Sequence, residues 1–285
     1  FCYLDPYKGA QIAFVECMRN LACSGAKALA VTDNLNFGNP NKPEAYYMLK
    51  ECVKGLADAC AFFDVPVVGG NVSLYNEHGD GAIDPTPVVS MVGLIDTQEQ
   101  VTRSQIEEPG LAIVLLGGLP NELGGSYYLQ TQFNKKEGKV PEVNLENEQN
   151  LQDLLLSQIE QGRIRAAHDL AEGGLLVGLS EMLFSETNLG AKISISSNEN
   201  MGRLDALLFG ESQGRVLVAV STADLDDLRK TSDLAAVSYH LLGKSDETGK
   251  IDLEVDERKI SSLDVGDLKS VWANAIPNHM EPTKD

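Results

Sequence analysis

The first hundred residues alternate between amphipathic helical segments and short apolar segments, and this alternation restricts the fold more than any other feature. Apolar side chains recur at Phe14, Cys17, Met18 and Leu21, which is the spacing of one face of a helix. The pattern predicts helices over 9–21 and 43–63, strands over 28–32, 65–68 and 88–95, and a hairpin loop over 78–81. Helices that alternate with strands predict layers of helix packed on sheet, in an α/β or α+β arrangement.

A second unit is expected to begin near residue 109. Residues 97–110 are polar and end in Glu108-Pro109-Gly110, which is typical of a linker, so we divide the chain into domains 1–108 and 109–285. The length of 285 residues agrees with two domains of roughly 100–200 residues each. For the second unit we expect, in order, a strand 111–116, a surface loop 134–150, helices 151–161 and 174–185, a strand 215–221, a helix 223–230, and strands 237–242 and 251–255 paired across 245–249.

Acidic side chains exceed basic ones by a wide margin. The chain has 42 Asp and Glu against 23 Lys and Arg, a formal net charge of −19. Nucleic acids and anionic membrane surfaces attract basic proteins, so this charge argues against both as partners. No apolar run approaches the about 18 residues that a membrane-spanning helix requires.

All five cysteines lie in the first 60 residues. Their number is odd and none is spaced as CxxC, while Cys17, Cys52 and Cys60 fall on the apolar faces of the two expected helices. We interpret them as buried, reduced thiols of a cytoplasmic protein rather than as a disulfide framework or a zinc site.

Two segments that combine Gly, Asn, Asp and Ser follow the first two strands. They are Asp33–Pro40 and Gly69–Leu74. Glycine lets backbone amides approach a phosphate closely, and Asp and Asn supply the oxygen ligands that Mg²⁺ prefers. If the two strands are neighbours, both segments open as loops at the same end of a sheet, where α/β proteins bind ligands. The alternative is that these residues only make turns, and composition alone leaves both interpretations open.

Familiar nucleotide and metal motifs do not fit the chain. A P-loop ending at Lys244-Ser245 would need glycine at position 238, which is serine. An EF-hand starting at Asp33 would place Leu35 and Phe37 where oxygen ligands belong. HExxH does not occur. Any nucleotide site in this chain is therefore of another type.

Two later polar segments are less informative. Asp169 stands shortly before Gly173-Gly174 at the start of an expected helix, and we expect it to cap that helix rather than to act in catalysis. The loop Glu211-Ser212-Gln213 leads into a strand, and its spacing leaves a ligand-facing turn and a plain connection equally open.

An ordered set of motifs, spread over roughly residues 5–221, resembles the second half of phosphoribosylformylglycinamidine synthase, the FGAM synthase family of purine biosynthesis. These motifs are Asp5-Pro-Tyr-Lys-Gly9, Arg19-Asn20, Thr32-Asp-Asn-Leu-Asn-Phe-Gly-Asn-Pro40, Pro66-Val-Val-Gly-Gly-Asn-Val-Ser-Leu-Tyr-Asn76, Pro85-Thr-Pro87, Glu122-Leu-Gly-Gly-Ser126, Ala167-His-Asp-Leu-Ala-Glu-Gly-Gly174 and Leu208-Phe-Gly-Glu-Ser-Gln-Gly-Arg215.

The resemblance implies a two-domain fold similar to aminoimidazole ribonucleotide synthetase, with the first domain truncated at its N-terminus. It also implies a cytoplasmic ligase that uses ATP and Mg²⁺ to amidate formylglycinamide ribonucleotide, with ammonia supplied by a glutaminase subunit or domain. Matched motif by motif, Asp33 and Gly70 would bind ATP, Asn71 would bind Mg²⁺, and Ser73 would bind the ribonucleotide.

The catalytic histidine of this family lies in an N-terminal half that these 285 residues lack. We therefore expect no catalytic residue here, no turnover by the chain alone, and the missing half as a partner. The alternative is a non-catalytic scaffold half that holds a structural nucleotide, in which the Glu211–Gln213 loop lines an auxiliary site. Selenophosphate synthetases and thiamine-monophosphate kinases share the superfamily, but we do not expect them to carry the Asn36–Pro40 block.

Overall fold

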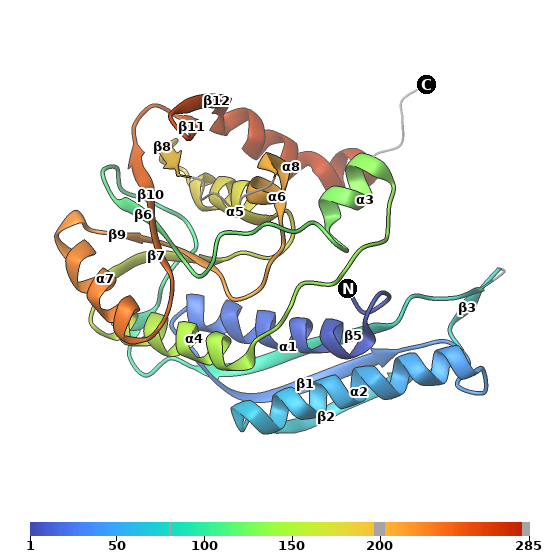
Figure 1. The fold of residues 1–285 in the computed structure, drawn as a ribbon. Coiled ribbons are helices and arrows are strands. Elements are labelled where there is room, and N and C mark those ends of the chain that lie inside the picture. Colours follow the sequence, from blue (N-terminus) through green and yellow to red (C-terminus); the bar gives the residue numbers. More distant parts are fainter. Residues whose placement is uncertain (80, 197–202, 281–285) are drawn as a thin grey trace.

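The computed structural model of the chain describes residues 1–79, 81–196 and 203–280. Two units are visible in the ribbon, and the first lies below the second in Figure 1. The elements of the first unit are α1 (Pro6–Cys23), β1 (Lys27–Asn36), α2 (Pro43–Phe63), β2 (Val67–Ser73), β3 (Glu77–His78), β4 (Gly81–Ala82), β5 (Thr86–Leu94) and η1 (Gln98–Gln100).

The first unit is a three-stranded sheet, in the order β2–β1–β5, packed against α1 and α2 (Figure 1). Helix α1 begins where the Asp5 side chain accepts a hydrogen bond from the Lys8 backbone N–H, with Pro6 in its first turn. A buried cluster that includes Phe14, Val31 and Leu56 fills the space between helices and sheet. Both helices, all three strands and the hairpin occur where the sequence pattern predicts, but β1 and β2 continue to Asn36 and Ser73, beyond the expected ends at residues 32 and 68.

The second unit contains a seven-stranded sheet in the order β12–β11–β8–β10–β6–β9–β7. Its elements are β6 (Ala112–Leu116), α3 (Tyr127–Phe133), α4 (Leu145–Glu160), β7 (Ile164–Asp169), α5 (Gly174–Leu183), β8 (Gly190–Ile195), α6 (Leu204–Phe209), β9 (Val216–Val220), η2 (Thr222–Asp224), α7 (Leu225–Leu234), β10 (Tyr239–Asp246), β11 (Lys250–Val255), β12 (Arg258–Asp264) and α8 (Val265–Met280).

Helices cover both faces of the centre of this sheet. Ile113 and Leu217 point into a core shared with α5, whereas Val114 and Val218 point into a core shared with α4 and α7. Every residue of β6 and β9 is consequently buried. This double coverage explains why both strands are continuous apolar runs rather than alternating ones.

The expected pairing of strands 237–242 and 251–255 is wrong. In the structure β8 lies between β10 and β11, antiparallel to the first and parallel to the second. The hairpin partner of β11 is β12, across a tight turn in which Asp256 and Glu257 both have positive φ. The second position of such a turn is usually glycine, and Glu257 stands there instead, so the local sequence carries no strong hairpin signal.

The expected surface loop over 134–150 is partly wrong as well. Helix α4 begins at Leu145, because the Asn144 side chain accepts a hydrogen bond from the Asn147 N–H and caps the helix. The acidic residues Glu146 and Glu148 that made this stretch look like a loop are favourable in the first turn of a helix.

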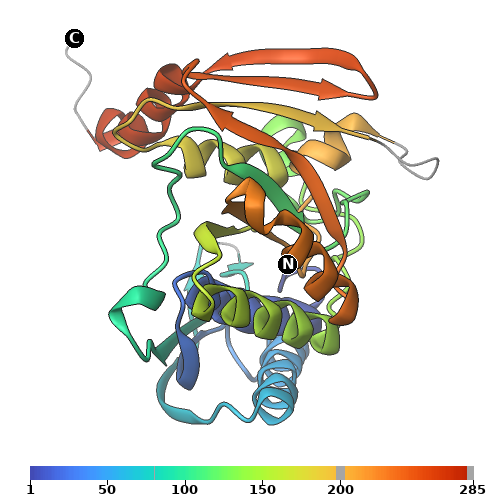
Figure 2. The same cartoon turned by 90° about the vertical axis from the view of Figure 1, so that its left-hand side faces the viewer.

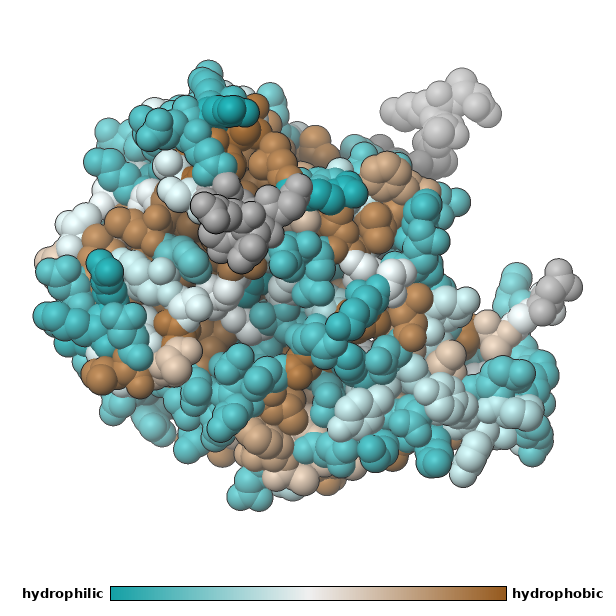
Figure 3. Space-filling view, in the orientation of Figure 1, coloured by the Kyte–Doolittle hydropathy of each residue, from teal (hydrophilic) through white to brown (hydrophobic). Residues whose placement is uncertain are grey.

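Helix α4 lies beside α1 and joins the two units, as the two ribbon views together show (Figures 1 and 2). The face drawn in Figure 3 is mostly hydrophilic, with apolar side chains in small groups, as expected from the excess of acidic residues. Within residues 1–79, 81–196 and 203–280, none of the helices combines the length and the apolar character needed to cross a membrane.

Candidate functional site

The four residues singled out for ligand binding lie on two neighbouring strands. Strands β1 and β2 are parallel, and their register places Asp33 opposite Gly70, Asn34 opposite Asn71, and Asn36 opposite Ser73. The two strands are neighbours, which is the condition that a shared ligand site required. The expectation of two loops is wrong, because the backbone of both segments continues the strands as far as Asn36 and Ser73.

The four residues divide between the two faces of the sheet. Successive side chains of a strand alternate between faces, so Asn71 and Ser73 share one face and Asp33 and Gly70 share the other. The face of Asn71 and Ser73 is uncovered, since alternate residues of β5 from Thr86 to Leu94 are exposed there. Asp33 faces α2, which carries Cys60. Burial of the Cys60 thiol raises its pKa, and the charge of the Asp33 carboxylate raises it further.

Gly70 has no side chain for a local reason. A Cβ at this position would lie 2.1 Å from Asp33 Oδ1, so the Asp33 carboxylate occupies the space that a side chain of residue 70 would need. At Gly69 nothing lies within 4 Å of such a Cβ. Of the two glycines, only Gly70 is therefore required to lack a side chain, because the Asp33 carboxylate lies against it.

Asn71 and Ser73 make different hydrogen bonds. Asn71 Nδ2 donates to Asn34 Oδ1 at 3.3 Å, which leaves the Asn71 carbonyl oxygen on the uncovered face as an acceptor. Ser73 Oγ donates to Asn76 Oδ1 at 3.2 Å, and Asn76 Nδ2 donates to the carbonyl oxygens of Phe37 and Ser73. Ser73 is thus held in place by a turn that ties the end of β2 to the end of β1.

The Asn71 oxygen fits Mg²⁺ as one ligand of several. Amide oxygens are suitable hard ligands, but Mg²⁺ requires about six oxygens in octahedral geometry. Within the described residues there is no group of three or more His, Cys, Asp or Glu side chains arranged to hold a metal ion. Most ligands of a Mg²⁺ at Asn71 would therefore be phosphate oxygens, water or groups from another polypeptide.

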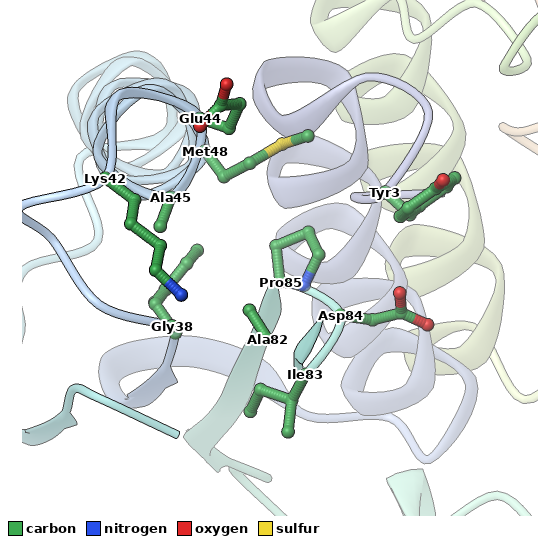
Figure 4. A pocket seen from close by; sticks show the side chains of 11 residues that line it. Tyr3, Gly38, Lys42, Glu44, Ala45, Met48, Ala82, Ile83, Asp84 and Pro85 are labelled. Carbon is green, nitrogen blue, oxygen red and sulfur yellow. The ribbon is translucent and has the colours of Figure 1, made fainter. Parts of the chain in front are cut away.

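A cleft of about 270 Å³ lies near the end of β1 (Figure 4). Residues from the start of α2, among them Glu44 and Met48, form one side, and Tyr3 and Asp84 lie on the other. Its interior is largely apolar, and the ring of Tyr3 is covered in part by the Lys136 ammonium, 3.9 Å from the ring centroid. The cleft could not be predicted from local sequence, because its walls come from three segments that are distant along the chain.

The Glu211–Gln213 loop lies at the junction of the two units, and all three of its side chains make internal contacts. Glu211 accepts hydrogen bonds from two backbone N–H groups, those of Tyr127 and Gly173. Ser212 Oγ donates to a carboxylate oxygen of Glu122 at 2.9 Å, and Gln213 Oε1 accepts from the Arg19 guanidinium at 3.0 Å. In this structure the loop joins neighbouring segments together.

Arg19 is the centre of a buried ionic cluster that the sequence analysis did not assign a role. Its side chain is fully buried, and Nη1 donates to Glu148 Oε1 of α4 at 2.6 Å. Its Nε lies 3.7 Å from Asp169 Oδ2, an ion pair without a hydrogen bond. A usable signal was present, because Ile12, Val15 and Arg19 follow helical spacing on the buried side of α1.

Asp169 does not cap α5, contrary to expectation. It is the last residue of β7, and Gly173 with positive φ is the N-cap of α5. Burial raises the pKa of Asp169, and Arg19 opposes that rise. Nearby, burial followed by the charges of Glu172 and Asp169 raises the pKa of Glu16 to about 7. Acidic groups thus outnumber Arg19 and the neighbouring, fully buried Arg215 at this junction.

The fold is that of an α/β protein of two units with a candidate ligand site on its first sheet, and sequence comparison identifies the family. Residues 1–95 match the model described as AIR synthase related protein, N-terminal domain, and residues 108–256 match AIR synthase related protein, C-terminal domain. The chain therefore belongs to the AIR synthase related protein family.

Individual relatives are more specific than the family description. The chain is 38% identical over 284 residues to phosphoribosylformylglycinamidine synthase subunit PurL of Alkaliphilus metalliredigens, an alignment that covers 100% of this chain and 38% of the relative. T. maritima PurL complexed with ATP superimposes with a TM-score of 0.74 at 21% identity, over 93% of this chain and 42% of that one. T. maritima PurL complexed with FGAR gives a TM-score of 0.77 at 20% identity, over 94% and 44%.

Proposed function

We propose that the chain is part of an FGAM synthase and that the β1–β2 strand pair supplies contacts to ATP, Mg²⁺ and substrate. The reaction is the ATP-dependent amidation of formylglycinamide ribonucleotide, in which ATP activates the amide and ammonia displaces the phosphate. One observation carries the proposal: the register of β1 against β2 sets Asp33 beside Gly70 and brings Asn71 and Ser73 onto one uncovered face. The identity to a PurL subunit over the whole chain supports it.

Each of the four residues has a limited role in this proposal. Ser73 hydrogen bonds to the ribonucleotide, and the Asn71 carbonyl oxygen is a ligand of Mg²⁺, which when bound neutralises phosphate charge. Asp33 and Gly70 contact ATP. They lie on the opposite face from Asn71, but β2 is an edge strand, so a ligand at its free edge can reach both faces.

The partners follow from what this chain does not contain. It spans about 38% of the length of the PurL relative, so we propose that the remaining N-terminal part contributes the catalytic residues and that a glutaminase subunit or domain supplies ammonia. The uncovered face of the first sheet supports a docked partner, because Val92 and Leu94 are each at least half exposed there.

A full-length synthase that carries this sequence at the matched region tests the proposal. Asn71→Ala and Ser73→Ala should each reduce ATP- and ammonia-dependent conversion of FGAR by about 100-fold or more. Asn274→Ala is a matched control, because that amide bonds only within α8. The 285-residue chain alone should show no conversion, and measurable synthesis by it would contradict the proposed need for an N-terminal half.

A second candidate is a non-catalytic, nucleotide-binding scaffold half of the same enzyme. The observation in its favour is the Glu211–Gln213 loop, whose side chains all bond to neighbouring segments of the chain. The same experiment separates the two candidates. If Asn71→Ala and Ser73→Ala leave synthesis unchanged while the protein retains bound nucleotide, the scaffold function is correct.

A further inference from the structure

Asn76 lies in the turn that follows β2, and its side chain contacts the ends of both strands of the candidate site. Asn76 Nδ2 donates to the carbonyl oxygens of Phe37, at 3.1 Å, and Ser73, at 2.9 Å. The Asn76 backbone N–H donates to the same Phe37 oxygen at 3.1 Å. The residue is half-buried, so water screens these hydrogen bonds only in part. The Asn76 side chain is therefore held in one place at the end of the β1–β2 pair.

The backbone of the turn brings the Asn76 side chain back toward Ser73. Tyr75 has a φ of 61°, in the left-handed region that a residue with a bulky side chain rarely adopts. Its N–H donates to the Gly38 carbonyl oxygen at 3.1 Å, and the Phe37 N–H donates to the Ser73 carbonyl oxygen at 3.0 Å. These hydrogen bonds hold the reversed backbone in place. A strained residue beside a candidate site is a reason to ask what the turn does for that site.

The orientation of the Asn76 amide follows from its partners. A carboxamide has an NH₂ group, which donates hydrogen bonds, and an oxygen, which accepts them. Since two carbonyl oxygens face one end of the amide, that end must be the NH₂ group. The atom that faces Ser73 Oγ, 3.2 Å away, is consequently Oδ1. A reversed amide would set its oxygen against the two carbonyl oxygens and lose both hydrogen bonds.

This orientation determines which kind of hydrogen bond Ser73 can offer to a ligand. A hydroxyl has one proton and two lone pairs, and Asn76 Oδ1 accepts that proton. The lone pairs of Ser73 Oγ remain for the ligand. A phosphate oxygen is also an acceptor, so it would have to take the proton away from Asn76 Oδ1 and leave that oxygen without its partner. An O–H or N–H group of a ligand meets a free lone pair and disturbs nothing.

We propose that Asn76 is a positioning residue that makes Ser73 a hydrogen-bond acceptor, so that the substrate group bound at Ser73 is an O–H or N–H donor and not the phosphate. The inference rests on the proposed function, in which Ser73 binds the ribonucleotide. Formylglycinamide ribonucleotide has donors of two kinds, the ribose hydroxyls and the amide N–H groups. Either kind suits the lone pairs of Ser73, whereas a phosphate that is ionised at about pH 8 offers acceptors.

The first experiment measures kcat and KM in a full-length synthase that carries this sequence at the matched region. Asn76→Ala should lower kcat/KM for FGAR by about 10-fold, because the Ser73 hydroxyl is then free to rotate, and it should leave KM for ATP unchanged. The double variant with Ser73→Ala should be no slower than Ser73→Ala alone, since Asn76 acts through Ser73. Asn41→Ala is the matched control. This exposed amide donates to the Tyr75 hydroxyl of the same turn at 3.4 Å, and its loss should preserve kcat/KM.

The second experiment keeps Asn76 in place, so it remains decisive if Asn76→Ala does not fold. Calorimetry compares wild type with Ser73→Ala in binding FGAR and analogues that lack one ribose hydroxyl, carry N-methyl at one amide, or lack the phosphate. One analogue without a donor should bind about 10-fold more weakly than FGAR to the wild type but equally well to Ser73→Ala. A deoxy analogue with this pattern identifies a ribose hydroxyl as the partner, and an N-methyl analogue identifies an amide N–H. Loss of the phosphate should weaken binding to both proteins by the same factor.

The possible failures can be told apart. If Ser73→Ala leaves FGAR conversion unchanged, the proposed function of Ser73 is wrong and this inference falls with it. If Ser73→Ala is impaired, the inference alone is overturned by any of three results. These are a Ser73-dependent effect of the phosphate, no such effect for any analogue without a donor, or effects of Asn76→Ala and Ser73→Ala that multiply in the double variant. Circular dichroism of each variant establishes that folded proteins are compared.

Discussion

The substitution Arg19→Met is expected to lower the free energy of unfolding by about 3–5 kcal/mol, because it leaves two buried carboxylates without their counter-ion. Arg19 is fully buried, and its partners Glu148 and Asp169 are only 1% and 6% exposed. Methionine keeps much of the side-chain volume, so the loss of stability reflects the missing charge rather than a cavity. The cluster joins α1 to α4 and β7, so the penalty falls on the junction between the two units.

The assay is urea denaturation followed by far-UV circular dichroism and by the fluorescence of Trp272, the single tryptophan, which lies in the second unit. Lys8→Met is the matched control, because it removes the exposed Lys8–Glu142 pair, in which the side chains are 29% and 59% exposed. An exposed pair of this kind contributes about 1 kcal/mol or less. The two variants remove the same charge and differ in burial.

Restoring charge balance should recover most of the loss. The triple variant Arg19→Met, Glu148→Gln and Asp169→Asn neutralises the Arg19 guanidinium and both of its carboxylate partners together, and it should lie within about 1–2 kcal/mol of the wild type. The reasoning is refuted if Arg19→Met costs no more than Lys8→Met, or if the triple variant is less stable than the single one.

Two further predictions concern the strand pair and the acidic junction. Gly70→Ala should lower the free energy of unfolding by about 1–3 kcal/mol, since its Cβ would lie 2.1 Å from Asp33 Oδ1, whereas Gly69→Ala should be nearly neutral. Thermal unfolding compares the two variants directly. Equal losses of stability would contradict the contact between position 70 and Asp33. The pKa of Glu16 is raised on folding from 4.5 to about 7, so the folded state binds its proton more tightly and stability falls as the pH rises through that interval. Glu16→Gln removes this pH dependence and should stabilise the chain by about 1–3 kcal/mol at pH 8 but by little at pH 5. Urea denaturation midpoints across that pH range measure the effect. A stability difference between variant and wild type that does not change with pH would refute the prediction.

The elements that local patterns could predict are those with strong apolar periodicity. Helices α1 and α2 and strands β1, β6 and β9 lie where the spacing of apolar residues indicates. Elements with weak patterns were missed or misjudged: α4 begins in an acidic stretch, and β12 follows a turn without glycine or asparagine. Local sequence reports which face of a segment is apolar, but it reports nothing about which strand becomes the neighbour of another.

The candidate site shows the same difference between what local sequence predicts and what the pairing of strands decides. The residue types of Asp33, Gly70, Asn71 and Ser73 were recognisable from the sequence, but their division between two faces of a sheet was not. That division depends on both segments continuing as strands, which is favourable only because each finds hydrogen-bonding partners in the other.

The sequence by itself determined the two-unit α/β plan and the acidic character of the protein, and it predicted which residues meet a phosphate and its metal. The tertiary structure alone decided that Arg19 joins the two units and that β8 separates β10 from β11. The physical reason is the same in both cases. Hydrogen bonds and ion pairs form between groups that are distant along the chain, so their free energy depends on the path of the whole backbone rather than on local sequence.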